Sequence, residues 1–328
     1  MAQYRILSLM RPTGRLHMGN MLGALTNWVK LQNEHECFFG VADWHALTTG
    51  FDDTSEIREN TRQMVIDWIS MGLDPKKCTI FVQSDVKQHA ELHLLLSMIT
   101  PLSWLERCPT YKDQLKQLSA KEINTYGFLG YPVLMASDIL IYKADRVPVG
   151  EDQEPHLELT REIARRFNYL YEPVFPEPIA IHTETKVLPG IDGRKMSKSY
   201  GNLIEMSSSP ETIKEKVMMM ITDPQRIRKN DPGHPDVCNV FAFYKAFDDE
   251  KTIFNEVREL CEKGAIGCVQ CKKNLANLII YKTEHIREKR SQLEKDPKII
   301  DDILAEGAVN ARKVAEQTLE EVRKAMKL

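Results

Sequence analysis

Two short segments, far apart in the sequence, carry residues suited to binding a polyphosphate. The first, residues 10–20, reads M-R-P-T-G-R-L-H-M-G-N and lies between an apolar run at 4–9 and a segment with helical spacing, which predicts a strand-to-helix turn. His17 and Asn20 supply polar side chains, Gly19 lets the backbone approach a ligand, and the first N–H groups of a helix attract anionic oxygens. A Gly and a His after a strand are also ordinary turn residues, so this segment alone decides little.

The second segment, residues 195–199, reads K-M-S-K-S and follows Gly190, Asp192 and Gly193. Two lysines three residues apart, next to hydroxyl side chains and glycines, are typical of a mobile cationic loop that contacts phosphates. A charge run by itself is usually a solvated surface. The two segments together favour a polyphosphate site.

A single acidic residue, Asp138, interrupts an apolar helix predicted over residues 132–142. Removing a carboxylate from water costs free energy unless it has a partner, so Asp138 is either a structural cap or ion-pair residue or a ligand contact. Two further acids, Glu151 and Asp152, begin a predicted helix, where the helix dipole favours negative charge whether or not a ligand binds.

The seven cysteines fall into two groups. Three are scattered singly and are expected to be buried thiols: Cys37, Cys78 and Cys108. The other four follow the pattern C-x22-C-x6-C-x2-C: Cys238, Cys261, Cys268 and Cys271. Four cysteines in one stretch of a chain from a reducing compartment favour a metal site over disulfides, either zinc or an iron–sulfur cluster.

The first part of the chain alternates short apolar runs with helical periodicity. Strands are predicted near 4–9, 37–43 and 78–83, and helices near 55–71 and 87–99. This alternation indicates a parallel sheet, which binds ligands at the carboxyl ends of its strands, where His17 and Asp43 lie. Beyond Met206 the pattern is helical to the end. The sequence therefore predicts an α/β protein with a helical C-terminal part.

Composition sets limits on location and partners. The 328 residues are 28% charged and 42% hydrophobic, and no apolar run reaches the roughly 18 to 20 residues that span a bilayer. With no secretory leader at the N-terminus, the chain is expected to be cytoplasmic and not bound to a membrane. The net charge of -3 does not indicate a nucleic-acid binder, so any RNA contact must use local patches.

Several of these segments resemble those of one enzyme class. Residues 12–20 resemble the first signature of the class I aminoacyl-tRNA synthetases, and residues 195–199 match their second signature letter for letter. Residues 41–48, 131–140 and 147–153 are similar to the tryptophanyl members of the class. The tyrosyl members share the architecture, but the neighbourhood of Asp138 and the cysteines argues against them.

The resemblance implies a Rossmann-like catalytic domain over residues 1–206 and an all-helical domain over 207–328 that binds the tRNA anticodon and carries the metal site. It also implies a reaction. ATP would activate L-tryptophan to tryptophanyl-adenylate and pyrophosphate, with Mg²⁺, and the tryptophan would then pass to the 3′ end of tRNA-Trp. A homodimer is expected on the same ground.

Roles for individual residues follow from the resemblance alone. The catalytic residues would be His17, Asn20, Lys195 and Lys198. The ATP contacts would be Arg11, Pro12, Thr13, Gly19, Asn20, Gly150, Glu151, Asp152, Leu188, Lys195, Met196, Ser197, Lys198 and Ser199. The tryptophan contacts would be Tyr131, Met135, Asp138, Val147, Val149 and Gln153, with Asp138 accepting the indole N–H. A lysine within 112–121 is also expected at the phosphates, with Lys112 and Lys116 as candidates.

The cysteine spacing resembles that of a subset of bacterial tryptophanyl synthetases that carry a 4Fe-4S cluster, so we favour this cluster, with Zn²⁺ as the alternative. The chain departs from the family at two positions: Leu9 stands where many relatives have glycine, and Arg11 where many have glutamine. Two other classes remain as rivals: a related nucleotidyl transferase, and a catalytically silent relative. The silent relative would be expected to lack His17 or Lys195, and both are present.

Overall fold

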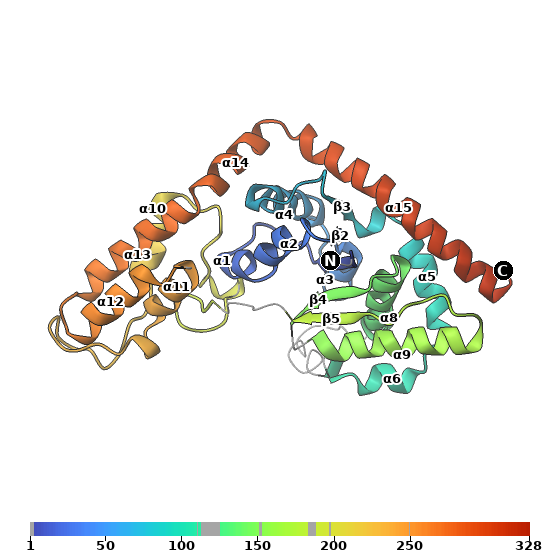
Figure 1. Cartoon of the computed structure of the whole chain (residues 1–328), viewed down its shortest axis with the longest axis horizontal. Helices are drawn as coiled ribbons and strands as arrows, with labels where there is room; N and C mark the ends of the chain where they lie inside the picture. The colour runs from blue at the N-terminus through green and yellow to red at the C-terminus, as the bar shows by residue number, and fades with distance from the viewer. Residues whose placement is uncertain are drawn as a thin grey trace.

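The computed structural model describes residues 3–109, 111–112, 125–150, 153–182, 188–196, 198–248 and 250–328. The described part of the chain contains a five-stranded parallel sheet with the order β3-β2-β1-β4-β5, drawn at the centre of Figure 1. The strands are β1 (Arg5–Met10), β2 (Glu36–Val41), β3 (Cys78–Val82), β4 (Arg146–Val149) and β5 (Ile179–His182). The predicted parallel sheet and its first three strands are confirmed.

Alternate side chains of β2 enter two hydrophobic cores, one on each face of the sheet. On one face, the ring of Phe39 stacks on Trp28 at a centroid distance of 4.5 Å, and Trp28 meets Trp68 edge-on at 5.1 Å. On the other face, Phe38 stacks on Tyr142 at 4.8 Å. A strand that is buried on both faces reads as a continuous apolar run, which is why the sequence shows β2 without alternation.

Leu9, one of the two departures from the family pattern, packs beside a glycine on the next strand. Leu9 pairs with Gly40 of β2, and a Cβ atom built on Gly40 would lie 2.3 Å from Leu9 Cδ2 and 2.8 Å from the ring of Phe81. The absence of a side chain at residue 40 therefore provides the room that Leu9 occupies.

Helices cover both faces of the sheet. The predicted helix after the first signature begins as α1 (Met18–Asn20), continues through a π-helical turn, η1 (Met21–Leu25), and ends as α2 (Thr26–Leu31). The other helices of this part are α3 (Asp43–Gly50), α4 (Ile57–Met71), η2 (Gln83–Asp85), α5 (Gln88–Ser97), α6 (Leu102–Arg107), α8 (Tyr126–Ile141) and α9 (Glu154–Leu170). The predicted helices at 55–71, 87–99 and 132–142 are confirmed as α4, α5 and α8.

A helical arm follows the second signature and extends away from the sheet (Figure 1). Its elements are η4 (Lys198–Tyr200), α10 (Pro210–Met219), η5 (Pro235–Val237), α11 (Asn239–Phe247), α12 (Thr252–Glu262), α13 (Cys268–Lys282) and α14 (Glu284–Lys295). Helix α14 returns to pack on α4, and the last helix, α15 (Lys298–Met326), crosses the sheet domain. The division of the chain at residue 206 stays a prediction. Helix α15, although it lies at the end of the chain, packs against β3, α5 and α8 of the sheet domain.

Helix α15 lies against β3, which is an edge strand of the sheet. Its buried residues include four small ones at helical spacing: Gly307, Ala308, Ala311 and Ala315. A Cβ atom built on Gly307 would lie 1.7 Å from the carbonyl oxygen of Ile80, so helix and strand backbones touch. Among the described residues, no helix is long and apolar enough to cross a bilayer.

We expect Gly307→Ala to lower the free energy of unfolding by roughly 2 kcal/mol or more, because the added methyl group must push α15 away from Ile80. Gly50→Ala is the matched control, since nothing lies within 4 Å of a Cβ atom at this helical glycine. Alanine there should be neutral or slightly stabilising. Urea denaturation of both variants tests the prediction, and equal stabilities would contradict the close approach of α15.

Candidate active site and cysteine cluster

The first signature forms a reciprocal cap at the start of α1. His17 Nδ1 accepts hydrogen bonds from the backbone N–H groups of Gly19 (3.1 Å) and Asn20 (3.3 Å), and Asn20 Oδ1 accepts from the His17 N–H at 3.1 Å. Because Nδ1 is an acceptor, the neutral imidazole must carry its proton on Nε2. Burial and, to a smaller extent, the nearby Lys198 ammonium lower the pKa of His17 to about 4. The ring therefore presents a neutral Nε2–H donor at physiological pH.

The two signature segments are in contact with each other. Lys198 Nζ donates to the carbonyl oxygen of Thr13. The backbone just after the lysine loop runs alongside the first signature, with Met18 N–H donating to Ile204 O and Met206 N–H to Leu16 O, both at 2.9 Å. The structure thus brings together two segments that are about 180 residues apart in the sequence.

The remaining residues predicted at ATP are distributed around this contact. Met196 and Leu188 are buried in the core beneath it, and a Cβ atom at Gly19 would lie 3.5 Å from Met196 Sδ and 2.9 Å from His17 Nδ1. Pro12 is buried, whereas Lys195 is exposed, with its carbonyl oxygen accepting from Asn202 Nδ2. Glu151, Asp152, Ser197 and Lys116 lie outside the described residues, as does the side chain of Ser199, and Lys112 is an exposed helical residue.

A pocket of about 340 Å³ opens at the carboxyl ends of β1, β2 and β4. All six residues predicted to contact tryptophan line it, together with Arg11 and Gly150. The full lining is Leu7, Ser8, Leu9, Arg11, Ala42, His45, Thr48, Tyr131, Met135, Asp138, Ile139, Val147, Pro148, Val149, Gly150, Gln153 and His156. The structure therefore places these predicted contacts around one cavity; their individual roles stay predictions.

The carboxylate of Asp138 lies at the bottom of this pocket and is fully buried. It accepts three hydrogen bonds of 2.7 Å each: from His45 Nε2, from Gln83 Nε2 and from His89 Nδ1. Burial opposes ionisation, but the hydrogen bonds and charges of the two histidines outweigh it and lower the pKa of Asp138 to about 2. With both oxygens offering about four lone-pair positions, the described residues leave one position for a ligand donor.

Two further pairs of buried polar groups lie near this carboxylate. His89 Nε2 is 2.8 Å from the Tyr142 hydroxyl, and burial raises the pKa of Tyr142, so that the hydroxyl stays protonated. At the other side of the pocket, the Tyr131 hydroxyl lies 3.0 Å from His156 Nε2. Burial also raises the pKa of Tyr131, so it is a neutral hydrogen-bonding group.

Sequence reasoning placed residues 43–45 at the ligand-binding edge of the sheet but assigned no role in this site to His45, Gln83, His89 or His156. A signal existed for two of them. His45 follows β2 and Gln83 follows β3, and the carboxyl ends of parallel strands meet at one edge of the sheet. His89 and His156 lie within helices and reach Asp138 and Tyr131 only through tertiary packing, which periodicity does not reveal.

The four spaced cysteines line one small cavity in the helical arm, together with Arg226. They come from three places: Cys238 caps α11, Cys261 lies near the end of α12, and Cys268 and Cys271 occupy the first turn of α13. Burial raises the pKa of the Cys271 thiol to about 12. Cys37, Cys78 and Cys108 are buried free thiols, as predicted.

Four thiols are donors that suit a metal, but as placed in this structure they do not form a metal site. Among the residues that the structure describes, no three His, Cys, Asp or Glu side chains form a group that could hold a metal ion as placed. Arg226 Nη1 donates toward Cys261 Sγ at 3.7 Å and Cys268 Sγ at 4.0 Å, and its Nε is buried without a partner. A guanidinium directed at sulfur favours negative charge there.

The tautomer and pKa of His17 give a direct test. We expect the imidazole to remain neutral with its proton on Nε2 between pH 5 and pH 8, because its pKa is about 4. Since this pKa lies below the usual 6.5, neutral His17 should support folding above pH 6.5, and this support should be lost as the pH falls through 4. Nitrogen-15 NMR titration checks this, with His17→Asn assigning the signal; a midpoint above pH 6 would refute it.

The chain is similar to known proteins over most of its length. Residues 2–281 match the family described as tRNA synthetases class I (W and Y). The tryptophan–tRNA ligase of Thermotoga maritima is 55% identical, with 99% of each chain covered, and that of Aquifex aeolicus is 47% identical, with 99% of this chain and 100% of the other covered. The crystal structure of the tryptophanyl-tRNA synthetase of Campylobacter jejuni with ADP and tryptophan superposes with a TM-score of 0.89 at 36% identity, covering 99% of this chain and 100% of that one.

Proposed function

This chain belongs to the class I tRNA synthetases for tryptophan and tyrosine and is a tryptophan–tRNA ligase, and from this premise we propose how its residues perform the reaction. In the first step the carboxylate of L-tryptophan attacks the α-phosphorus of ATP in line, forming tryptophanyl-adenylate and releasing pyrophosphate. In the second step a terminal ribose hydroxyl of tRNA-Trp attacks the carbonyl carbon of the adenylate, which forms the aminoacyl ester and breaks the mixed anhydride, so that AMP leaves and the hydroxyl proton is released. Positioning and charge stabilisation carry most of the rate in such a phosphorus displacement.

The phosphates would lie between the two signature segments. On one side, His17 Nε2–H, the Asn20 amide and the backbone at Gly19 are donors at a helix start. On the other side, Lys198 and Lys195 supply positive charge from the second signature. The carbonyl oxygen of Thr13 holds the Lys198 ammonium beside the first signature, so that a phosphate oxygen entering there would replace one neutral acceptor by a charged one.

The tryptophan side chain would occupy the pocket above Asp138. The observation that carries this assignment is a fully buried, ionised carboxylate with one lone-pair position left by the described residues. Indole N–H is only a donor, so it matches an acceptor that is kept free of protons. Met135, Val147 and Val149 would pack against the flat ring, while Tyr131 and Gln153 would contact the amino acid's polar end.

The adenosine and its ribose would lie near Gly150, Glu151 and Asp152, with Arg11 at the pocket mouth. Arg11 Nη2 donates to Thr49 Oγ1 at 2.5 Å and to Ala46 O at 3.4 Å, so its guanidinium is fixed across the start of the cavity. Mg²⁺ would arrive with the ATP phosphates and neutralise the pyrophosphate charge.

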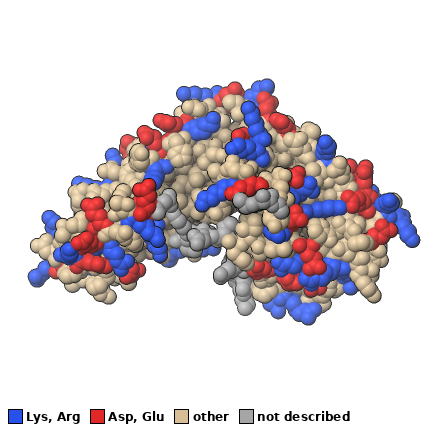
Figure 2. Space-filling model, viewed as in Figure 1, with Lys and Arg blue, Asp and Glu red and all other residues tan. Residues whose placement is uncertain are grey.

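The tRNA would span the arm and the sheet domain. Basic and acidic side chains are mixed over the face shown in Figure 2, so RNA contact would depend on local groups of lysine and arginine. A homodimer is part of the proposal. Exposed apolar side chains on α5, α6 and α8 would suit the second copy: Leu94, Met98, Leu102 and Tyr126.

We also propose that Cys238, Cys261, Cys268 and Cys271 hold a metal centre, a 4Fe-4S cluster in preference to Zn²⁺. The four thiols line one cavity, and the Arg226 guanidinium would offset the negative charge of a thiolate-ligated centre. When bound, such a centre would link α11, α12 and α13 within the arm, and no step of the ligase reaction is assigned to it.

Amino-acid-dependent ATP–pyrophosphate exchange tests the tryptophan pocket. We expect exchange with tryptophan and not with tyrosine. Asp138→Asn should lower kcat/KM for tryptophan by roughly tenfold to hundredfold, because it removes a charged acceptor, with little change in KM for ATP. Asp302→Asn, at an exposed position of α15, is the control and should match the wild type. Unchanged tryptophan kinetics in Asp138→Asn would refute the assignment.

Anaerobic purification followed by iron, sulfide and zinc analysis tests the cysteine cluster. A 4Fe-4S centre predicts about four iron and four sulfide per chain, whereas a structural zinc site predicts about one zinc. Cys268→Ser should abolish the bound metal. Cys37→Ala removes a buried thiol elsewhere and should leave it intact. A wild-type chain that binds no metal after reconstitution would refute the metal centre.

A further inference from the structure

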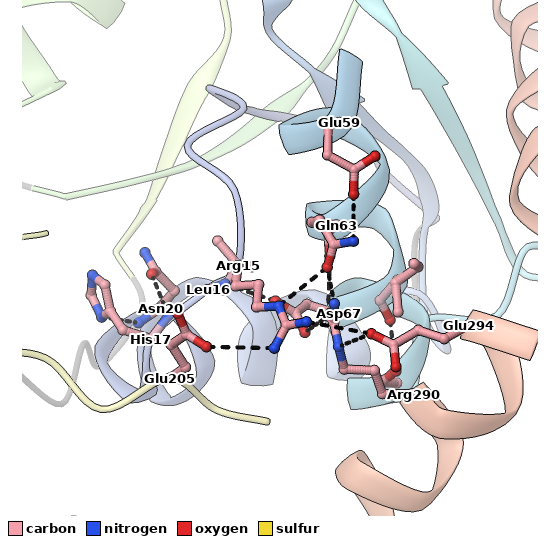
Figure 3. Close-up of polar contacts among 12 residues, drawn as sticks. Arg15, Leu16, His17, Asn20, Glu59, Gln63, Asp67, Glu205, Arg290 and Glu294 are labelled. Atoms are coloured by element: carbon pink, nitrogen blue, oxygen red, sulfur yellow. Dashed lines mark hydrogen bonds and ion pairs between the residues drawn. The ribbon is translucent and has the colours of Figure 1, made fainter. Parts of the chain in front are cut away.

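A buried ion pair connects the helical arm to the first signature (Figure 3). Arg290 on α14 is 3% exposed and Asp67 on α4 is fully buried. Arg290 Nη1 donates to Asp67 Oδ1 at 2.5 Å, and the other oxygen, Oδ2, accepts from the backbone N–H of Leu16 at 2.7 Å. One carboxylate therefore joins a residue of the arm to the residue immediately before His17.

Both backbone polar groups of Leu16 are hydrogen-bonded, and this fixes the position of the residue. Its N–H is bound by Asp67, and its carbonyl oxygen accepts from Met206 N–H, just beyond the lysine loop. His17 then caps α1 through Nδ1. A shift of the Asp67 carboxylate would be transmitted to the imidazole through a single residue, because Leu16 itself is buried and packed in the core.

Additional hydrogen bonds to α4 and within α14 orient the Arg290 side chain. Its Nη2 donates to Gln63 Oε1, and its Nε donates to Glu294 Oε1 at 3.0 Å. Arg15, the residue before Leu16, donates to the same Gln63 oxygen at 3.3 Å and lies 3.7 Å from Glu294. The sequence gives no sign of this network, since Asp67 appears as one acid on a helix and Arg290 as one charge in a basic stretch.

We propose that Arg290 and Asp67 are positioning residues for ATP, which set the Leu16–His17 backbone and thereby make the phosphate site depend on how α14 lies on α4. The proposal rests on the proposed function, in which His17 and Gly19 contact the phosphates. Neither residue touches substrate. Burial raises the pKa of the Asp67 carboxyl, and the Arg290 charge and the Leu16 N–H oppose that rise.

The geometry predicts an effect that is selective for one substrate. The phosphate contacts depend on residues 17–20, which follow Leu16, whereas the tryptophan pocket is lined from α8, β4 and the ends of β1 and β2, upstream of Leu16 or on other elements. Disturbing Asp67 should therefore impair the use of ATP while leaving tryptophan binding in place. A general loss of structure would impair both.

Arg290→Met tests this in tryptophan-dependent ATP–pyrophosphate exchange. We expect kcat/KM for ATP to fall by about tenfold to hundredfold, as small misplacements of catalytic groups do, with KM for tryptophan changed by less than about twofold. Lys295→Met is the matched control: it removes one positive charge from an exposed position of the same helix and should behave like the wild type. Equal losses for ATP and tryptophan, or no loss for ATP, would overturn the proposal.

A double-mutant cycle keeps the test valid if an unpaired buried charge harms folding. Asp67→Asn with Arg290→Met leaves no charge without its partner, so this double variant should fold when a single variant does not. If Arg290 acts through Asp67, the two losses in kcat/KM for ATP should be strongly non-additive. Additive losses would overturn the proposal.

His17→Ala separates this proposal from the one on which it rests. If His17→Ala lowers kcat/KM for ATP and Arg290→Met does not, the positioning role is wrong and the phosphate site stands. If His17→Ala has no effect on ATP kinetics, the assignment of the phosphate site itself is wrong, and the positioning role falls with it.

Discussion

A carboxylate that water does not reach must find its hydrogen-bond donors within the protein, and two such carboxylates organise this molecule. Asp138 gathers His45, Gln83 and His89 beneath the pocket, and Asp67 gathers Arg290 and the Leu16 N–H behind the first signature. In each case the donors come from segments far apart in the sequence. The requirement to satisfy one buried charge therefore fixes the relative positions of several elements around each half of the active site.

Much of the fold was predictable because its signals are local. The apolar runs predict β1, β2 and β3, and strand–helix alternation predicts the parallel sheet whose ends carry His17 and Asp43. The resemblance assigned the tryptophan contacts as a group, and all six line one cavity. The sequence does not reveal His89, Arg290 or the return of α15, because each depends on packing between segments separated by many residues, and the cysteine spacing predicts convergence without the distances that a metal requires.

The two lysines of the second signature differ in a way that their spacing does not predict. Both lysines are exposed, but Lys198 donates to the Thr13 carbonyl oxygen beside the first signature, whereas Lys195 lies at the other end of the loop. A cation that is already beside the phosphates strengthens binding in the ground state and in the transition state alike. A cation that must move inward contributes most when charge develops on the leaving pyrophosphate. In the proposed phosphate site, Lys198 would take the first role and Lys195 the second.

The arm is attached to the sheet domain by two contacts of different kinds. Helix α14 is joined to α4 through the Arg290–Asp67 ion pair, and α15 is joined to β3 through the close approach at Gly307. The ion pair depends on the direction of its hydrogen bonds, because a small displacement in a buried site would leave each charged group without its partner. The apolar contact at Gly307 depends on distance, because the backbones touch there. Together the two contacts restrict the position of the base of the arm, and this restriction links the helices of the arm to the backbone of His17.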